Sequence, residues 1–189
     1  ALGVGLFLFI NQQSGLSVLL WLSLVSLWLH QFEEYRYTGY FPGMVNSVLY
    51  ASQQPDRFPL NTQTSLIVNV FIGWLFYFLA AVLTDKALWL GIATILVSLG
   101  NVVAHTLLFN IKGRTFYNPG MATAVILFLP ICGYFFYYVI AYRVATPLDW
   151  ILGIILGGVL NYIGILKLID WLKNENTDYI FPKRCLIPD

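Results

Sequence analysis

The side chains best suited to acid–base or metal chemistry lie in two short motifs. His30, Glu33 and Glu34 form a His-x-x-Glu-Glu run, and His105 is the second of only two histidines. Helix positions i, i+3 and i+4 share one face, so the first three side chains point the same way. Imidazole and carboxylate groups suit zinc or non-haem iron, and a metal-free Glu–His pair can instead activate water. The sequence therefore predicts His30, Glu33, Glu34 and His105 as catalytic or metal-binding residues and leaves both chemistries open.

A second group of polar residues accompanies His105. Asn101 lies four residues before this histidine, on the same helix face, where it is expected to support the imidazole from behind. Residues 117–123, YNPGMAT, open a new helix whose first-turn N–H groups are suited to an anionic ligand. Pro-Gly is also an ordinary helix start, and the threonine could simply bond a backbone carbonyl. The predicted ligand-binding residues are Asn101, Tyr117, Gly120 and Thr123.

The two glutamates also have a plainer interpretation. Carboxylates near the middle of a bilayer cost about 2.5–3.5 kcal/mol each, and less toward the headgroups. Glu33 and Glu34 lie about a turn from the expected helix end and close to Arg36. In this interpretation both carboxylates are interfacial and point to water.

Long apolar runs must position these residues. The chain of 189 residues is 59% hydrophobic and 10% charged, whereas soluble domains are about 25% charged. A bilayer-spanning helix needs roughly 20 apolar residues, and backbone groups in lipid must be paired within the segment. We expect an all-α, polytopic membrane protein with about five transmembrane helices, at about 15–35, 62–83, 87–111, 119–142 and 148–172.

These spans divide the chain into three parts. Residues 1–14 are expected to be an N-terminal lead-in or part of a further helix, 15–172 one transmembrane domain, and 173–189 a cytoplasmic tail. The net charge of +1 predicts no nucleic-acid partner. The two cysteines form no CxxC pair, so the sequence indicates neither a metal knuckle nor a disulfide framework.

Basic residues predict the orientation of the spans. One side of a five-span chain receives eight of the ten basic residues, and the other side receives Lys86 and Arg143. Short cytoplasmic loops carry the excess of Lys and Arg, so the N-terminus is expected outside and the C-terminus in the cytoplasm. We expect an integral protein of a bacterial inner (plasma) membrane. The eight residues are Arg36, Arg57, Lys112, Arg114, Lys167, Lys173, Lys183 and Arg184.

The two histidine regions resemble each other. Residues 28–44 and 103–121 each hold a histidine, a basic and aromatic linker, and Tyr-x-Pro-Gly-Met. One intervening span separates the two histidine-bearing helices, so both run in the same direction. The sequence predicts a parallel internal repeat of two helices, followed by a fifth helix.

Three motifs together are similar to those of the HXXEE-motif membrane protein family. The first is His30-Gln31-Phe32-Glu33-Glu34, the second an NxxxH pattern ending at His105, and the third a YxPGxxT pattern ending at Thr123. All three occur in order between residues 30 and 123. The resemblance implies a small multi-helix membrane protein and carries no established activity.

Two functions are compatible with these residues. The first is a metal-dependent hydrolase with a cytoplasm-facing His/Glu site that acts on a lipid-like or membrane substrate. The second is a non-catalytic membrane subunit that binds a metal, a lipid or a pigment, or packs in a larger membrane complex. Membrane lipids are the expected partners, with other membrane protein subunits as the alternative partners.

Overall fold

The computed structural model describes residues 14–188, and all regular secondary structure in that part of the chain is helical. The expected lead-in at residues 1–13 lies outside the described residues. Five helices are long and apolar enough to cross a membrane, which confirms the all-α fold and the number of spans. They comprise Gly15–Tyr37, Thr62–Lys86, Leu88–Gly113, Met121–Ala141 and Pro147–Leu172.

Polar caps fix where several spans begin. Ser14 accepts a hydrogen bond from the backbone N–H of Ser17 at 3.1 Å, and Asn61 caps the second span in the same way. Thr146 and Asp149 form a reciprocal capping box before the fifth span. Each cap satisfies N–H groups that have no partner within the helix, so the spans start where the sequence supplies these side chains.

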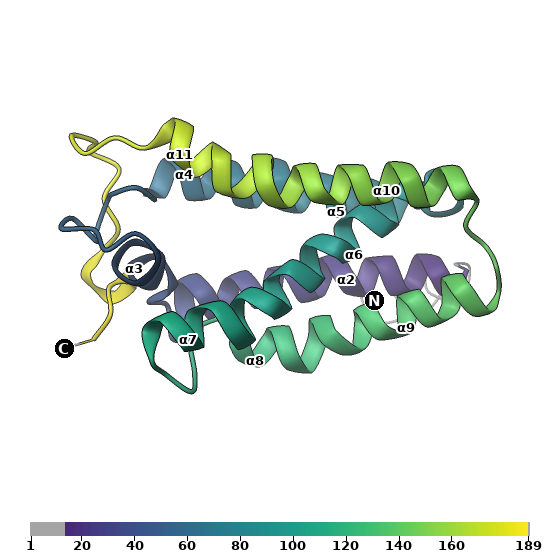
Figure 1. Cartoon of the computed structure of the whole chain (residues 1–189), viewed down its shortest axis with the longest axis horizontal. Helices are drawn as coiled ribbons and strands as arrows, with labels where there is room; N and C mark the ends of the chain where they lie inside the picture. The colour runs from purple at the N-terminus through teal and green to yellow at the C-terminus, as the bar shows by residue number, and fades with distance from the viewer. Residues whose placement is uncertain (1–13, 189) are drawn as a thin grey trace, which may run out of the picture.

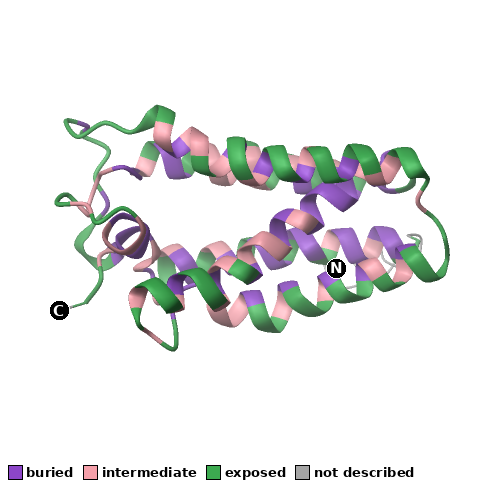
Figure 2. Ribbon diagram, viewed as in Figure 1, coloured by how far each residue is buried: buried purple, intermediate pink, exposed green. Residues whose placement is uncertain are grey.

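The spans pack as an up-and-down bundle around α6 (Figure 1). The helix α6 runs diagonally through the molecule and packs closely on α10, where Gly153 and Gly157 permit short backbone distances. Small residues at such crossings are typical of membrane helices. Large apolar side chains remain exposed on the outer faces, as expected for surfaces that meet lipid (Figure 2). The longer helices are α2 (Gly15–Phe32), α5 (Leu75–Leu83), α6 (Leu88–Val103), α9 (Leu129–Ala141) and α10 (Pro147–Val159).

Every span also contains a π-helical stretch, in which the backbone hydrogen bonds reach one residue further than in an α-helix. Such stretches are frequent at functional sites. The one in the fourth span ends just before Pro130, whose missing N–H makes a local change of helix geometry expected. The five stretches are η1 (Glu33–Tyr37), η3 (Val68–Trp74), η5 (Ala104–Leu108), η6 (Ala124–Phe128) and η7 (Leu160–Lys167).

The connecting segment 38–61 and the C-terminal residues 173–188 lie together at one end of the bundle (Figure 1). This end also contains the short helices α3 (Phe41–Met44), α4 (Thr62–Ile67), α7 (Phe109–Gly113), α8 (Met121–Thr123) and α11 (Leu168–Leu172). The Phe181 N–H donates to the carbonyl of Asp56 at 2.8 Å, and Arg184 donates to the carbonyl of Tyr35 at 2.7 Å. The C-terminal residues are therefore packed against the bundle end and cover it.

The Pro-Gly-Met parts of the two similar sequence regions, 28–44 and 103–121, lie at the start of different helices. Pro42 lies in α3, a short helix outside the spans, whereas Pro119 lies directly before the fourth span. The parallel repeat stays a prediction. The two unequal groups of basic residues do lie at opposite ends of the bundle, but the side that each end faces also stays a prediction.

Candidate metal centre

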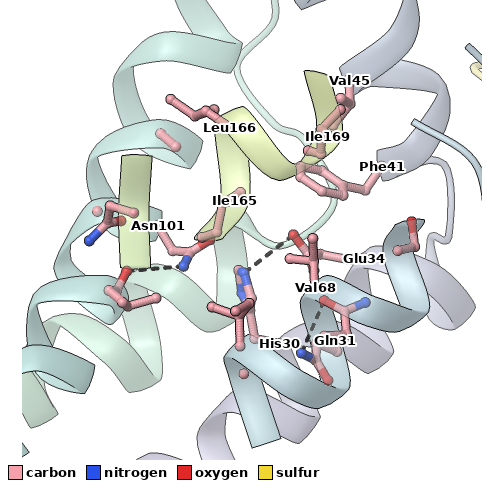
Figure 3. Close-up of a pocket in the computed structure, with 18 of the residues that line it drawn as sticks. His30, Gln31, Glu34, Phe41, Val45, Val68, Asn101, Ile165, Leu166 and Ile169 are labelled. Carbon is pink, nitrogen blue, oxygen red and sulfur yellow. Dashed lines mark hydrogen bonds and ion pairs between the residues drawn. The ribbon is translucent and has the colours of Figure 1, made fainter. Parts of the chain in front are cut away.

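A cavity of about 330 Å³ extends into the bundle at the end that holds α3 (Figure 3). Residues of η1, η3, η5 and η7 contribute to its walls, so four of these five π-helical stretches border it. Most of the lining is apolar, and its polar part includes His30, Glu34 and His105 together with amide side chains such as Asn69 and Asn161. Asn101 is part of this lining, as its place on the helix face suggested.

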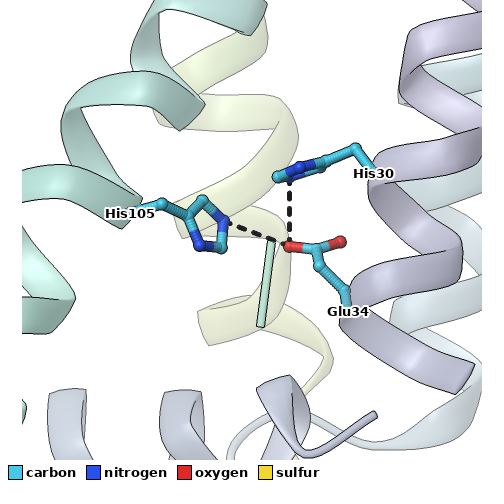
Figure 4. Close-up of side chains that lie close together, drawn as sticks. All are labelled: His30, Glu34 and His105. Atoms are coloured by element: carbon cyan, nitrogen blue, oxygen red, sulfur yellow. Dashed lines mark ion pairs between the residues drawn. The ribbon is translucent and has the colours of Figure 1, made fainter. Parts of the chain in front are cut away.

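His30, Glu34 and His105 converge in the lining of the cavity, and Figure 4 shows the three side chains pointing toward one another. One oxygen of Glu34, Oε1, lies 3.4 Å from Nε2 of His30 and 3.3 Å from Nε2 of His105. The two imidazole rings stand edge to face, with centroids 4.9 Å apart. All three residues are buried, with exposures of 1%, 5% and 0% in chain order. The prediction that both histidines and a glutamate meet at a common point is confirmed.

Asn118 fixes the orientation of His105. Its amide Nδ2 donates to the backbone carbonyl of His105 and to Asn110 Oδ1, both at 2.7 Å. The carbonyl oxygen of the Asn118 amide therefore faces His105 Nδ1, 2.6 Å away, and accepts a hydrogen bond from it. The neutral ring consequently carries its proton on Nδ1 and presents a lone pair on Nε2.

Thr123 fixes His30 by the same logic. The Thr123 hydroxyl has one proton and lies 2.6 Å from Glu33 Oε2 and 3.2 Å from the carbonyl oxygen of Gly120, so it donates to one of these two acceptors. The hydroxyl oxygen must then accept from His30 Nδ1, which lies 2.9 Å away. His30 therefore also presents the lone pair of Nε2 to the cavity. Hydrogen bonds of this kind commonly hold and orient metal-binding histidines from behind.

The resulting group of acceptors requires a cation or an added proton. Both Nε2 atoms are buried without a hydrogen-bond partner, although each lies within ion-pair distance of Glu34. Among the described residues, Glu34 has ion pairs only with these two histidines, and no Lys or Arg neutralises it. Zinc ligands about 2.0–2.2 Å from the metal in a tetrahedron lie about 3.3–3.6 Å from each other. The two observed N–O distances, 3.3 and 3.4 Å, agree with that spacing. All three ligand atoms lie within 4.8 Å of one another.

Glu33 has a different place from its neighbour. Its carboxylate accepts from the Tyr117 hydroxyl at 2.6 Å, from the Ala122 and Thr123 N–H groups at 3.1 and 2.8 Å, and from the Thr123 hydroxyl. The first turn of the fourth span thus holds an anion, as the sequence suggested, but this anion belongs to the protein itself. Glu33 lies outside the group that could hold a metal and instead supports the Thr123–His30 contact.

The burial of both carboxylates contradicts the interfacial interpretation. Glu33 and Glu34 are each buried within the protein, and neither points to water beside Arg36. Burial, together with hydrogen bonding to Glu33, raises the pKa of Tyr117 to about 12. The phenol therefore keeps its proton and donates to the carboxylate.

Gly120 is required for both its backbone and its size. Its φ of +100° is unfavourable for a residue with a side chain. An added Cβ would also collide with His105 Cε1, and it would lie 2.9 Å from both ring nitrogens. Gly120 therefore lets the start of the fourth span lie directly against the imidazole.

The prediction that Asn101 supports His105 was wrong. Asn101 donates to the carbonyl of Val97 at 3.0 Å, and Asn118 makes the contact with Nδ1 instead. The sequence signal for Asn118 is its position inside the Tyr-x-Pro-Gly motif, directly before a proline, although Asn118 was not among the predicted site residues. Thr123 and Tyr117 contact Glu33, so their prediction as binders of an outside ligand stays untested.

A membrane-spanning helical bundle that buries a two-histidine, one-carboxylate group is the class of protein that this fold and site define. A sequence profile of the family described as "Protein of unknown function with HXXEE motif" matches residues 21–135. The chain belongs to this family. No curated protein and no solved structure matches the chain. The matched range includes every residue of the His/Glu group and its supporting contacts.

Proposed function

We propose that this protein is a metal-dependent hydrolase of the membrane in which His30, Glu34 and His105 hold zinc or non-haem iron. The observation that carries the proposal is the pair of buried Nε2 atoms, both without a hydrogen-bond partner and both directed toward one Glu34 oxygen. Two histidines and one carboxylate form a three-ligand set that leaves further coordination positions for water or substrate.

The protein's own groups define what such a site would do. His30 and His105 supply neutral ligands, and Glu34 supplies one negative charge, so the centre keeps a net positive charge with a divalent ion. A metal held there would supply Lewis-acid chemistry: it would polarise a carbonyl and lower the pKa of bound water. In ester hydrolysis the water oxygen bonds to the carbonyl carbon and the bond to the leaving oxygen breaks. The two hydrogens of water end on the acid and on the alcohol.

The setting of the site supports a lipid-like or membrane substrate. The cavity that meets the ligands is mostly apolar, and its walls belong largely to membrane spans. With the N-terminus outside and the C-terminus in the cytoplasm, the site would lie toward the cytoplasmic face of a bacterial inner membrane. The end of the bundle that holds the site also holds most basic residues, which supports this orientation.

The parallel repeat belongs to the same proposal. The two histidines occupy corresponding places in the two sequence copies, and their rings lie in contact. A site between two copies of one unit would explain why each copy contributes one imidazole. The two imidazoles have different supporting residues, Thr123 behind His30 and Asn118 behind His105, and both of these lie near the end of the second copy.

A non-catalytic metal-binding subunit is the second candidate. Among the described residues that line the cavity, Glu34 is the only carboxylate, and as a ligand it is not free to act as a general base. A protein that only binds a metal, or a metal with a lipid or pigment, needs no such base. Packing of the exposed apolar faces in a larger membrane complex is compatible with this candidate.

Metal analysis of the purified protein tests the proposal. The parent should contain about one zinc or iron per chain, and Glu34→Gln, His30→Ala and His105→Ala should each lose it, because each removes a ligand. Glu175→Gln, which makes the same change in an exposed tail residue, is the matched control. Equal metal content in the parent and all three ligand variants would refute the metal site.

Hydrolysis of chromogenic long-chain esters then separates the two candidates. The hydrolase requires turnover that depends on metal and disappears in Glu34→Gln. Bound metal without turnover of esters or amides would favour the binding subunit. Loss of folding in a ligand variant is recognised by its thermal transition measured beside that of Glu175→Gln.

A further inference from the structure

The cavity beside the metal centre has the dimensions and lining of a ligand site. Its volume of about 330 Å³ lies within the range of about 300–1,000 Å³ typical of ligand pockets. The metal-binding group lines the cavity, and most of the remaining lining is apolar, with side chains such as Leu27, Val97 and Ile165. A ligand that fills this space and meets the metal-binding group must therefore be mostly apolar and carry one polar group.

The cavity lies where two spans diverge. At one end α6 and α10 are in close contact, since a Cβ added to Gly153 would lie 2.6 Å from Ile92 and one added to Gly157 would lie 2.9 Å from Leu96. Further along, α7 and α11 continue these helices and turn away from each other (Figure 1). The cavity is lined by η5 and η7, the segments that connect the closely packed parts to the diverging parts.

Most of the exposed rim of the cavity faces the membrane. Leu108, Tyr162 and Leu166 line the cavity and are 40%, 57% and 48% exposed, and all three belong to membrane spans. A fourth exposed lining residue, Tyr50, is 42% exposed and lies in the connecting segment 38–61. Because the rim is formed mostly by the third and fifth spans, the cavity opens mainly sideways, toward the lipid.

Hydrogen-bonding groups in the walls favour a hydrocarbon over a peptide. The Asn101 amide donates to a carbonyl of its own helix, and the Asn161 amide donates to two backbone carbonyls. Gln31 is held by Asn69 and Trp74. A peptide backbone in the cavity would need partners for its own N–H and C=O groups. The side-chain N–H groups of Gln31, Asn101 and Asn161, which could bind its carbonyls, already donate within the protein. A hydrocarbon chain needs none.

We propose that the cavity receives a single hydrocarbon chain of a membrane amphiphile, which enters between the third and fifth spans from the side. The chain lies along the apolar walls, and the carbonyl-containing head group meets His30, Glu34 and His105. This inference rests on the proposed metal site and names its substrate class: a lipid with an ester or amide bond next to the chain.

Competition between a blocking side chain and a probe of defined length tests the inference. Dodecanohydroxamic acid and acetohydroxamic acid share the metal-binding head group and differ in the chain. Each is titrated into cobalt-loaded protein, and the visible spectrum of the metal reports binding. Ile72→Trp places a large ring in the cavity wall, whereas Leu75→Trp makes a similar change on the lipid-facing side of the same span.

We expect Ile72→Trp to weaken the dodecyl probe about tenfold or more while acetohydroxamic acid binds as before. Leu75→Trp should change the binding of neither probe, because residue 75 is on the lipid-facing side of the span. Partition of the probes into the detergent or bilayer is the same for all variants, so it does not affect the comparison. If Ile72→Trp does not fold, Val68→Phe on the same wall replaces it.

The possible failures are distinguishable. Equal binding of the dodecyl probe in both tryptophan variants would overturn the chain site and leave the metal site standing. A cobalt spectrum unchanged by both probes would overturn this inference together with the open coordination position of the proposed hydrolase. If Ile72→Trp weakened the binding of a dileucyl hydroxamate but not that of the dodecyl probe, the cavity would hold a peptide. That result would overturn the proposal of a hydrocarbon chain.

Discussion

Removal of the Thr123 hydroxyl tests how the supporting contacts control the metal centre. Thr123→Val keeps the shape of the side chain and deletes one oxygen. That oxygen lies 2.9 Å from His30 Nδ1 and 2.6 Å from Glu33 Oε2. Among the described residues, Thr123 alone connects the Glu33 carboxylate to the His30 ring by hydrogen bonds. The substitution breaks this connection and leaves the three proposed ligands themselves unchanged.

The structure suggests two separate effects and their sizes. A buried Nδ1–H left without an acceptor costs about 1–3 kcal/mol, so the metal-free variant should be less stable by that amount. Loss of the group that orients a ligating histidine weakens metal binding about 10–100-fold. At about 1.4 kcal/mol per tenfold change, this second effect corresponds to about 1.4–2.8 kcal/mol. Thr123→Ser restores the hydroxyl and should recover most of both.

Two measurements distinguish these effects. Competition with a chromogenic chelator gives metal affinity, and thermal unfolding without metal gives stability. Because the chain has only two histidines, nitrogen NMR of ¹⁵N-histidine-labelled protein follows each ring separately. In the parent both rings should carry the proton on Nδ1 when no metal is bound. In Thr123→Val, His30 should become a mixture of tautomers, while His105, held by Asn118, should stay unchanged.

The matched control is Thr94→Val. The Thr94 hydroxyl is buried, and its hydrogen bonds in the described part of the chain go to carbonyls of its own helix. This variant should lose some stability and keep its metal affinity. The reasoning would be refuted if Thr123→Val bound metal as tightly as the parent, or if Thr94→Val weakened binding as much.

Three further predictions concern the surroundings of the site. Gly120→Ala should be less stable by about 1–3 kcal/mol from its backbone conformation alone. It should also lose metal, because the added Cβ collides with His105. Thermal unfolding measures the first effect and metal analysis the second. The pKa of Tyr117 is raised to about 12 from an ordinary value of about 10, so the stability it contributes is present below about pH 10 and lost between about pH 10 and 12. Denaturation of Tyr117→Phe across that interval should lack this loss, and identical curves would contradict it. Cysteines placed at Lys86 and Glu175 should react with an impermeant thiol reagent from opposite faces, the first from outside; reaction from one face would contradict the five-span topology.

The positions of the spans were predictable from the sequence. Apolar runs of about twenty residues can satisfy their backbone groups in lipid only as helices, and polar caps such as Ser14 and Thr146 mark where the runs begin. The predicted ends lie within a few residues of the observed ones, because burial in a membrane depends on composition that can be read locally. The histidines at similar places in similar segments likewise indicated that the two rings meet.

The sequence could not predict which of the two glutamates belongs to the metal-binding group and which supports it. Successive residues in a helix are about 100° apart, so Glu33 and Glu34 lie about 60° and 40° to either side of His30. That difference is too small to select one of them. Contacts with other spans make the difference. Tyr117 and the first turn of the fourth span donate hydrogen bonds to Glu33. Glu34 instead lies beside His105 and belongs to the metal-binding group.

Tertiary structure also determined which residues support the two histidines. Asn101 was expected behind His105 because local helix spacing is the only distance that a sequence reveals. Asn118 takes that place because the chain turns back after the third span and the positive φ of Gly120 allows the turn to lie against the ring. The sequence by itself determined which residues are buried in helices and which faces they share. Only the packing of one span against another determined which donor meets which acceptor, since those contacts join residues about ninety positions apart.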